Sequence, residues 1–219
     1  MTIATPGKGP SIGGLVLRTF LWMPVCFAAW YFTARYHAAI AGALARGFAN
    51  LWGSGVIAGL ERAGNDLLFV TTLQAPGAGG AMGAVMVEVN PLTYTYGVAL
   101  FLALMLASRA SFLKIVLGAA ALLPFQGWGI AFDFLAQVGV RMGPEVAARA
   151  GFPPGGAEAI VLGYQLGALI FPSLVPVMAW VACNPAYLKG LLAARGSVAA
   201  SASQSSPLEG SNLPGAERP

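Results

Sequence analysis

The densest run of polar residues in this apolar sequence extends from Glu88 to Gly97 and reads Glu-Val-Asn-Pro-Leu-Thr-Tyr-Thr-Tyr-Gly. A carboxylate, an amide and two phenols so close together could bind a polar ligand or transfer a proton. A simpler interpretation is structural. Asn before Pro suits a junction between a strand and a helix, with Asn90 as the cap and Pro91 at the first helical position. The sequence leaves both interpretations open.

A second set of polar residues lies within a later apolar segment. Gln126, Asp133 and Gln137 are separated by seven and four residues, which places them on one face of a helix. Polar groups inside a membrane span are costly, so each is a candidate functional residue. Asp133 lies roughly 28 Å along the helix from Lys114, near the outer membrane surface, where water could simply solvate it. Gln126 lies deeper and is expected to find a hydrogen-bond partner in the bundle.

Together the two segments predict a polar pocket at the outer membrane surface. Its candidate residues are Glu88, Asn90, Tyr94, Tyr96, Gln126, Asp133 and Gln165. If Glu88 or Asp133 were buried there, its carboxylate could act as an acid or a base.

The search for a nucleophile or a metal site finds little. Cys26 lies about 12 Å into the first apolar segment from Arg18, and Cys183 ends the last one. A buried free Cys usually acts as a small apolar side chain. His37 is the only histidine, so a multi-histidine metal site is excluded. The sequence therefore predicts no catalytic residue, no metal and no cofactor.

The composition identifies the class of protein. Of the 219 residues, 57% are hydrophobic and 9% are charged, whereas soluble domains have about a quarter of their residues charged. A soluble enzyme or a nucleic-acid-binding protein is therefore not expected. A membrane helix needs about 20 mostly apolar residues, and four windows are close to this requirement, although the second is short. They are residues 15–34, 92–108, 112–140 and 159–183.

The charged residues predict the orientation of these spans. Six cations flank them on one side, without an acid before Glu209, whereas acids and arginines are mixed on the other side. The six are Lys8, Arg18, Arg109, Lys114, Lys189 and Arg195. Short cytoplasmic loops favour Lys and Arg. We therefore expect a bacterial inner-membrane protein with two cytoplasmic tails, residues 1–14 and a disordered tail at 186–219.

The loop of residues 35–91 is the largest segment expected outside the membrane. Apolar residues recur every three or four positions over 37–63, which predicts a helix that lies in the membrane interface or packs on the spans. Residues 67–73 and 84–89 read as the strands of a short β-hairpin. The fold class is thus an α-helical polytopic membrane protein of about four spans, with an outer interfacial helix and a hairpin.

This order of parts resembles the exosortase/archaeosortase superfamily, whose members process proteins that bear a C-terminal sorting signal. In that superfamily a catalytic Cys lies where the outer hairpin enters a span, and later spans supply an Arg and a His. The corresponding segments here read Val89-Asn90-Pro91-Leu92, Pro124-Phe125-Gln126-Gly127-Trp128-Gly129 and Tyr164-Gln165. The resemblance therefore implies the layout without the catalytic residues.

The sequence is also similar to the exosortase H-associated membrane protein family, over about residues 15–185. The run Asn90-Pro91-Leu92 with Tyr94 and Tyr96 carries this resemblance. It implies association with a sorting enzyme and supplies no biochemical activity.

Three functions follow from these observations. The first is a non-catalytic accessory or scaffold protein that binds an exosortase or its sorting-signal substrates, for example by adding an extended tail to the edge of strand 84–89. The second is a membrane enzyme that uses Asp133 or Glu88. A small transporter is the least favoured, because the sequence has no internal repeat and no polar path through the bilayer. The expected partners are thus a sorting enzyme or its substrates and the lipid bilayer.

Overall fold

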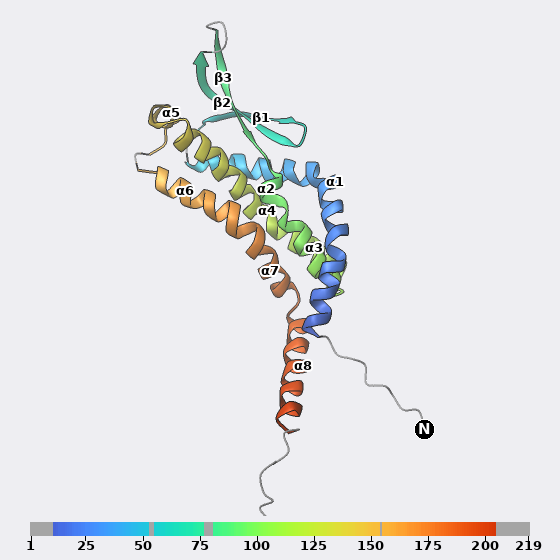
Figure 1. Ribbon diagram of the computed structural model, residues 1–219. Helices are drawn as coiled ribbons and strands as arrows, with labels where there is room; N and C mark the ends of the chain where they lie inside the picture. Colours follow the sequence, from blue (N-terminus) through green and yellow to red (C-terminus); the bar gives the residue numbers. More distant parts are fainter. Residues whose placement is uncertain (1–10, 53–54, 77–80, 154, 205–219) are drawn as a thin grey trace, which may run out of the picture.

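The structure, a computed structural model, describes residues 11–52, 55–76, 81–153 and 155–204. A bundle of apolar helices carries a small antiparallel sheet at one end (Figure 1). Three helical segments are long and apolar enough to cross a membrane: Ile12–Trp52, Phe112–Arg141 and Ala157–Cys183. The chain is thus a mostly helical membrane protein with a small sheet, as the sequence predicts.

These segments consist of several helices that follow one another without a loop. The elements are α1 (Ile12–Trp52), then α4 (Phe112–Ala136) with the π-helical turn η1 (Gln137–Arg141), and α6 (Ala157–Gln165) with η2 (Leu166–Ile170) and α7 (Phe171–Cys183). The short helix α5 (Pro144–Arg149) connects η1 to α6 at the end of the bundle that carries the sheet (Figure 1).

The fourth predicted span is shorter than a membrane helix. α2 (Leu92–Thr95) and α3 (Gly97–Ala107) form an apolar segment of about 24 Å, less than the roughly 30 Å of bilayer hydrocarbon. The predicted count of four spans is therefore not confirmed. Every residue of α3 is buried or half-buried, because α1, α4 and α7 pack around it. An enclosed helix is shielded from lipid by its neighbours.

The long helix α1 has two parts with different directions. Its first part stands beside α3, and its second part turns to lie across the bundle beneath the sheet (Figure 1). The small residues Ala38, Ala41, Ala45 and Ala49 are buried on this second part, and a side chain on Gly127 of α4 would lie 2.8 Å from the Leu44 Cβ. The sequence allowed this segment to lie in the membrane interface or to pack on the spans. In the structure it packs on α4.

The helix predicted over 37–63 ends earlier, at Trp52. Residues Ile57–Ala63 instead form β1, the first strand of the sheet. Gly55 adopts a positive φ of 77°, a conformation that ends helices and that residues other than glycine rarely adopt. The apolar side chains of Val56 and Ile57 are then buried against the sheet rather than on a helix face.

The predicted hairpin is part of a three-stranded antiparallel sheet with the order β1-β2-β3. β2 (Asp66–Pro76) and β3 (Met82–Val89) include both predicted strands and extend them. The sheet rests on the bundle through Phe69, whose ring centroid lies 5.0 Å from that of Phe134 on α4. β3 is an edge strand that continues directly into α2.

The second predicted tail is helical over much of its length. α8 (Pro185–Gln204) follows α7, so the expectation of disorder from residue 186 is wrong for these residues. Asn184 ends α7, and its side-chain amide donates to the Trp180 carbonyl at 3.0 Å. The tail residues 1–10 and 205–219 lie outside the described ranges.

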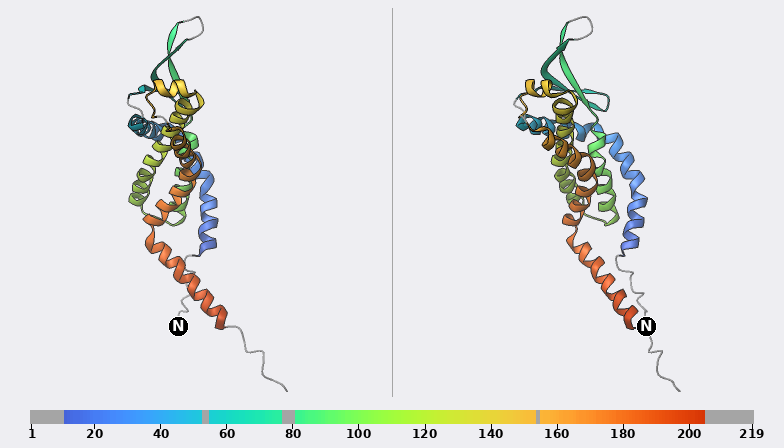
Figure 2. Two further views of the ribbon diagram at one scale, coloured as in Figure 1. Left: turned by 90° about the vertical axis from the view of Figure 1, so that its left-hand side faces the viewer. Right: turned by 60° about the vertical axis from the view of Figure 1, so that its left-hand side comes forward.

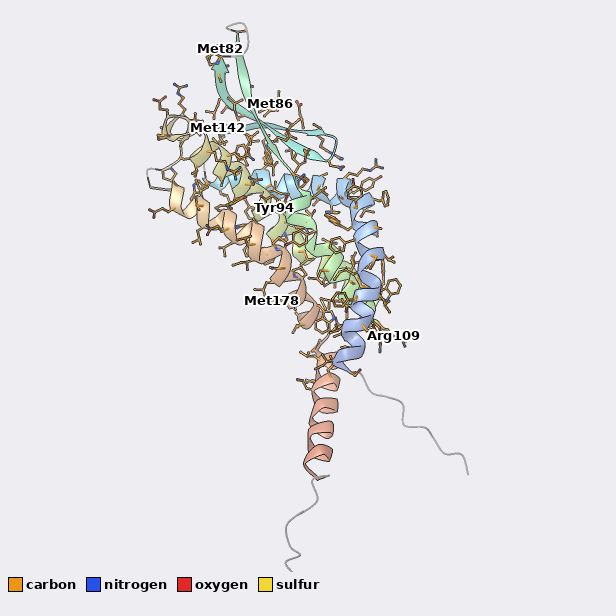
Figure 3. All side chains as sticks on the ribbon, in the orientation of Figure 1. Met82, Met86, Tyr94, Arg109, Met142 and Met178 are labelled. Carbon is orange, nitrogen blue, oxygen red and sulfur yellow. The ribbon has the colours of Figure 1, made fainter. Side chains whose placement is uncertain are left out.

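The start of α1 and helix α8 lie at the end of the bundle opposite the sheet (Figure 2). Arg109, in the turn between α3 and α4, lies toward the same end, whereas Met82 and Met86 project from β3 beyond the helices (Figure 3). The cation-rich connections and the sheet are thus at opposite ends of the molecule.

Candidate functional site

The junction between β3 and α2 is held by Asn90. Its side-chain Oδ1 accepts a hydrogen bond from the backbone N–H of Leu92 at 2.9 Å. This satisfies one of the unpaired amides at the start of the helix. Asn90 thus supports the junction, but the positions differ from the prediction: α2 begins at Leu92, and Pro91 rather than Asn90 occupies its N-cap position.

Tyr94 of α2 is buried in the bundle, with only 3% of its surface exposed. Its hydroxyl lies within interaction range of the Asp133 carboxylate and is also near Tyr164 and Arg141. The ring can lie against α4 because residue 129 is a glycine: a Cβ there would be 2.5 Å from the ring.

Gln137 connects this cluster to the sheet. Its side-chain amide donates to the Glu88 backbone carbonyl at 3.0 Å and to Asp133 Oδ1 at 3.3 Å. Arg141, one further turn along, places its guanidinium 5.6 Å from the centre of the Tyr164 ring. Asp133, Gln137 and Arg141 thus follow one another at four-residue spacing, along one side of α4 and η1.

We call these residues the sheet-base cluster. Its members come from α2, from α4 with η1, and from α6, and they are Tyr94, Asp133, Gln137, Arg141 and Tyr164. Asp133 is half-buried, faces one phenol and accepts a hydrogen bond from one amide. This arrangement fixes a carboxylate and, through Gln137, the last residues of the edge strand.

The other predicted residues lie elsewhere. Glu88 contributes its carbonyl to the cluster, whereas its side chain is exposed. Tyr96 packs beside Cys26 and Trp30 on α1, and Gln165 is exposed on α6. Among the seven residues, Tyr94 lies beside Asp133 through its hydroxyl and shares the lining of one pocket with Gln126.

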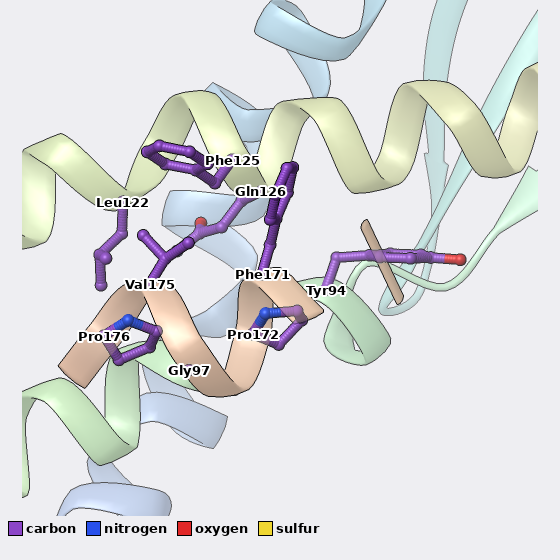
Figure 4. A pocket seen from close by; sticks show the side chains of 9 residues that line it. All are labelled: Tyr94, Gly97, Leu122, Phe125, Gln126, Phe171, Pro172, Val175 and Pro176. Carbon is purple, nitrogen blue, oxygen red and sulfur yellow. The ribbon is translucent and has the colours of Figure 1, made fainter. Parts of the chain in front are cut away.

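Gln126 is buried with 4% of its surface exposed, and its Oε1 has no hydrogen-bond partner among the described residues. For this oxygen, the described residues do not supply the hydrogen-bond partner that the sequence predicts. Its side chain lies among Leu122, Val175 and Pro176, and the Tyr94 hydroxyl points away from it (Figure 4).

Two participants, Arg141 and Tyr164, were not predicted, although the sequence carried a signal for the first. Arg141 is four residues beyond Gln137 and eight beyond Asp133, which continues the helical face already noted. Tyr164 belongs to another helix, and no spacing in the sequence relates it to Asp133.

The cysteines lie apart from the cluster. Cys26 is buried against Ala99 and Ala103 of α3, and Cys183 is the last residue of α7, with its Sγ 4.0 Å from the Lys114 carbonyl. Within the described part of the chain, no three His, Cys, Asp or Glu residues are grouped so that they could hold a metal ion.

The comparison with known families adds an identification to this geometry. The model of the exosortase H-associated membrane protein family matches residues 9–187, which include the whole bundle and the sheet. The chain belongs to this family. The family name links the chain to an exosortase system, and it states no biochemical activity. No curated protein and no solved structure matches the chain.

Proposed function

We propose that this member of the exosortase H-associated family is a non-catalytic accessory or scaffold protein of an exosortase-type sorting system. Its sheet would bind the sorting enzyme or the C-terminal tail of a substrate. Membership of the family supports the association. The free edge of β3, held at its base by Gln137, is the observation that carries the binding role.

The alternation of backbone groups along β3 indicates which residues face that edge. The Val85 carbonyl accepts a hydrogen bond from the Thr71 side chain of β2, so it faces the sheet. The Glu88 carbonyl faces Gln137, away from β2. Since neighbouring residues of a strand direct their backbone groups to opposite sides, Ala84 and Met86 present their N–H and C=O groups at the free edge.

An extended peptide could pair with these groups. Added strands gain main-chain hydrogen bonds from an exposed edge and specificity from alternate side chains. Met82 and Met86 are 59% and 55% exposed and flank the edge with adaptable apolar side chains.

The orientation of the bundle belongs to the same proposal. Arg109 lies toward the end away from the sheet (Figure 3), and the start of α1, which carries Arg18, and helix α8, which carries Lys189, lie at the same end (Figure 2). Short cytoplasmic segments favour such cations. We therefore place both termini in the bacterial cytoplasm and the sheet on the outer side of the inner membrane, where a translocated tail would reach it.

The proposal is tested in cells that lack this protein. Processing of a substrate with the C-terminal sorting signal is followed by the size shift on cleavage, with and without reintroduction of the wild-type chain. The accessory role predicts slower or incomplete processing in the deletion strain and recovery on complementation. Equal processing in both strains would rule the role out.

An enzymatic function would depend on Asp133. The observation in its favour is the half-buried carboxylate beside the Tyr94 hydroxyl. The accessory role is better supported, because Asp133 also accepts a hydrogen bond from Gln137, the residue that holds the base of β3.

A further inference from the structure

The side of α6 that faces away from the bundle carries an exposed amide. Gln165 lies eight residues after the start of the membrane-length segment Ala157–Cys183, about 12 Å along the helix. No charged residue occurs between Glu158 and the end of that segment. When the segment crosses the bilayer, with α6 and α7 at the margin of the bundle (Figure 1), the Gln165 side chain therefore lies at the level of the hydrocarbon.

The surroundings of Gln165 on this side are apolar. Leu162 and Leu169 lie one turn before and after it, and they are 58% and 70% exposed. A shallow surface hollow of about 320 Å³ extends from Ala157 to Gln165. We call this side of α6 the amide face, and its residues are Ala157, Glu158, Val161, Leu162, Gln165 and Leu169.

Two exposed hydroxyls of the membrane-length segments show the contrast with Gln165. The Thr33 hydroxyl donates to the Ala29 carbonyl at 2.7 Å, and the Ser173 hydroxyl donates to the Leu169 carbonyl at 3.0 Å. A hydroxyl paired in this way within its own helix can face lipid. An amide has two N–H donors and an acceptor oxygen, and leaving them unpaired in hydrocarbon is costly. Polar side chains within membrane spans almost always face protein or water. The position of Gln165 thus indicates that protein covers the amide face.

The chemistry of the amide indicates which protein covers it. An amide is self-complementary, because the N–H of one copy can donate to the Oε1 of another and symmetry supplies the return bond. Glutamine side chains form such bonds between membrane helices. The only charged residue of the amide face, Glu158, is about 10 Å nearer the sheet end, where water is available and two crossing helices have diverged. A second copy therefore satisfies both amides without any other polar residue.

We propose that two copies of this chain associate through the amide face. The two α6 helices cross at Gln165, whose side chains form a reciprocal pair of hydrogen bonds, and Leu162 and Leu169 pack around them. The two-fold axis is parallel to the membrane normal, so that both sheets lie on the same side of the membrane. This association does not depend on the proposed accessory function.

Energy transfer in vesicles measures the association of the full-length protein. In a chain without Cys26 and Cys183, Glu61→Cys in β1 carries a donor or an acceptor dye, and the protein-to-lipid ratio is varied. We expect a dimerisation curve, and about fivefold to thirtyfold weaker association for Gln165→Leu, which removes the amides and keeps an apolar surface. Thr33→Leu is the matched control, because its hydroxyl is already paired within α1. Its loss should leave the curve unchanged.

Disulfide cross-linking tests the contact directly. Leu162→Cys, one turn from Gln165 on the amide face, should give a covalent dimer on mild oxidation of the vesicles. Leu117→Cys on α4 is the control, because Leu117 is similarly exposed, at 60%, on another helix. It should remain monomeric. Neither variant alters a polar residue, so this result stands even if Gln165→Leu is unstable. Thermal unfolding in detergent checks that each variant is folded.

Three results would overturn the proposal. A chain that stays monomeric at every protein-to-lipid ratio would exclude a second copy. Equal association with and without Gln165→Leu would show that the amide is not part of the contact. Cross-linking of Leu162→Cys only to a different protein in native membranes would assign the amide face to a span of that protein. Substrate processing, which tests the accessory function, is measured separately and is not decided by any of these results.

Discussion

The side-chain amide of Gln137 donates to the backbone carbonyl of Glu88 at 3.0 Å, across 49 positions of the sequence. Through this bond the membrane-length segment Phe112–Arg141 holds the base of the edge strand β3. Because Gln137 also donates to Asp133, the position of the strand depends on the same polar cluster that contains Tyr94.

Replacing Gln137 by Leu should loosen β3. The Glu88 carbonyl and the Asp133 carboxylate both lose a donor, which we expect to cost about 1–3 kcal/mol of local stability. Hydrogen exchange should become faster at residues 86–89 and remain unchanged in α3. Gln165→Leu is the matched control, because that glutamine is exposed on α6. Equal exchange in both variants would contradict the role assigned to Gln137.

Replacing Asp133 by Asn separates the accessory role from the enzymatic one. Asn keeps the shape and one acceptor oxygen, so substrate processing in cells should remain within about twofold of wild type. Loss of a general acid or base typically lowers a rate by about 10²–10⁴-fold. A decrease of that size in a correctly folded variant would favour the enzyme.

Replacing Met86 by Pro should weaken binding at the β3 edge. Proline removes an N–H that faces outward and leaves the ladder to β2 intact, which edge strands tolerate. We expect about threefold to tenfold weaker capture of a sorting-signal peptide, measured by titration with a fluorescent peptide. Met86→Val keeps the N–H and should bind nearly as wild type. Equal binding by both variants would exclude this edge.

Two glycine substitutions test the packing of Tyr94 on α4. Gly129→Ala should destabilise the bundle by about 1–3 kcal/mol, because the new Cβ would lie 2.5 Å from the Tyr94 ring. Gly47→Ala in α1 meets no atom within 4 Å and should stabilise the helix by about 0.5–1 kcal/mol. Thermal unfolding in detergent measures both changes. Opposite signs are expected, and a neutral Gly129→Ala would show that Tyr94 is not packed there.

Cysteine labelling tests the proposed orientation. In a variant without Cys26 and Cys183, Glu61→Cys in β1 should react with a membrane-impermeant maleimide in cells whose inner membrane is intact. Arg109→Cys, in the turn at the opposite end, should react only after that membrane is opened. The reverse pattern would place the sheet in the cytoplasm.

The sequence predicted the helical framework well, because long apolar windows are a strong signal. It was less successful where a local pattern fits two structures. Ile57 and Leu60 have a spacing that suits a helix, yet they belong to β1: α1 ends at Trp52, and Gly55 has a positive φ. The window 92–108 forms α2 and α3, which together are shorter than a membrane helix, and apolarity alone does not show whether so short a segment crosses the bilayer.

The candidate site was predicted only within single elements. Asp133 and Gln137 share a helical face, which their spacing indicates directly. Tyr94 and Tyr96 were grouped together, although residues two apart in a helix point in nearly opposite directions. Only Tyr94 faces Asp133, and Tyr96 packs toward Cys26. The approach of Tyr164 and Arg141 depends on how α4 and α6 pack, which no local pattern encodes.

Co-purification tests the accessory role most directly. The tagged full-length chain is purified in mild detergent from its native membranes after brief cross-linking, and the co-purified proteins are identified by mass spectrometry. The account predicts reproducible recovery of a sorting enzyme or its tailed substrates with the wild-type chain, and markedly less with Met86→Pro than with Met86→Val. Recovery of neither class with the folded wild-type chain would contradict it.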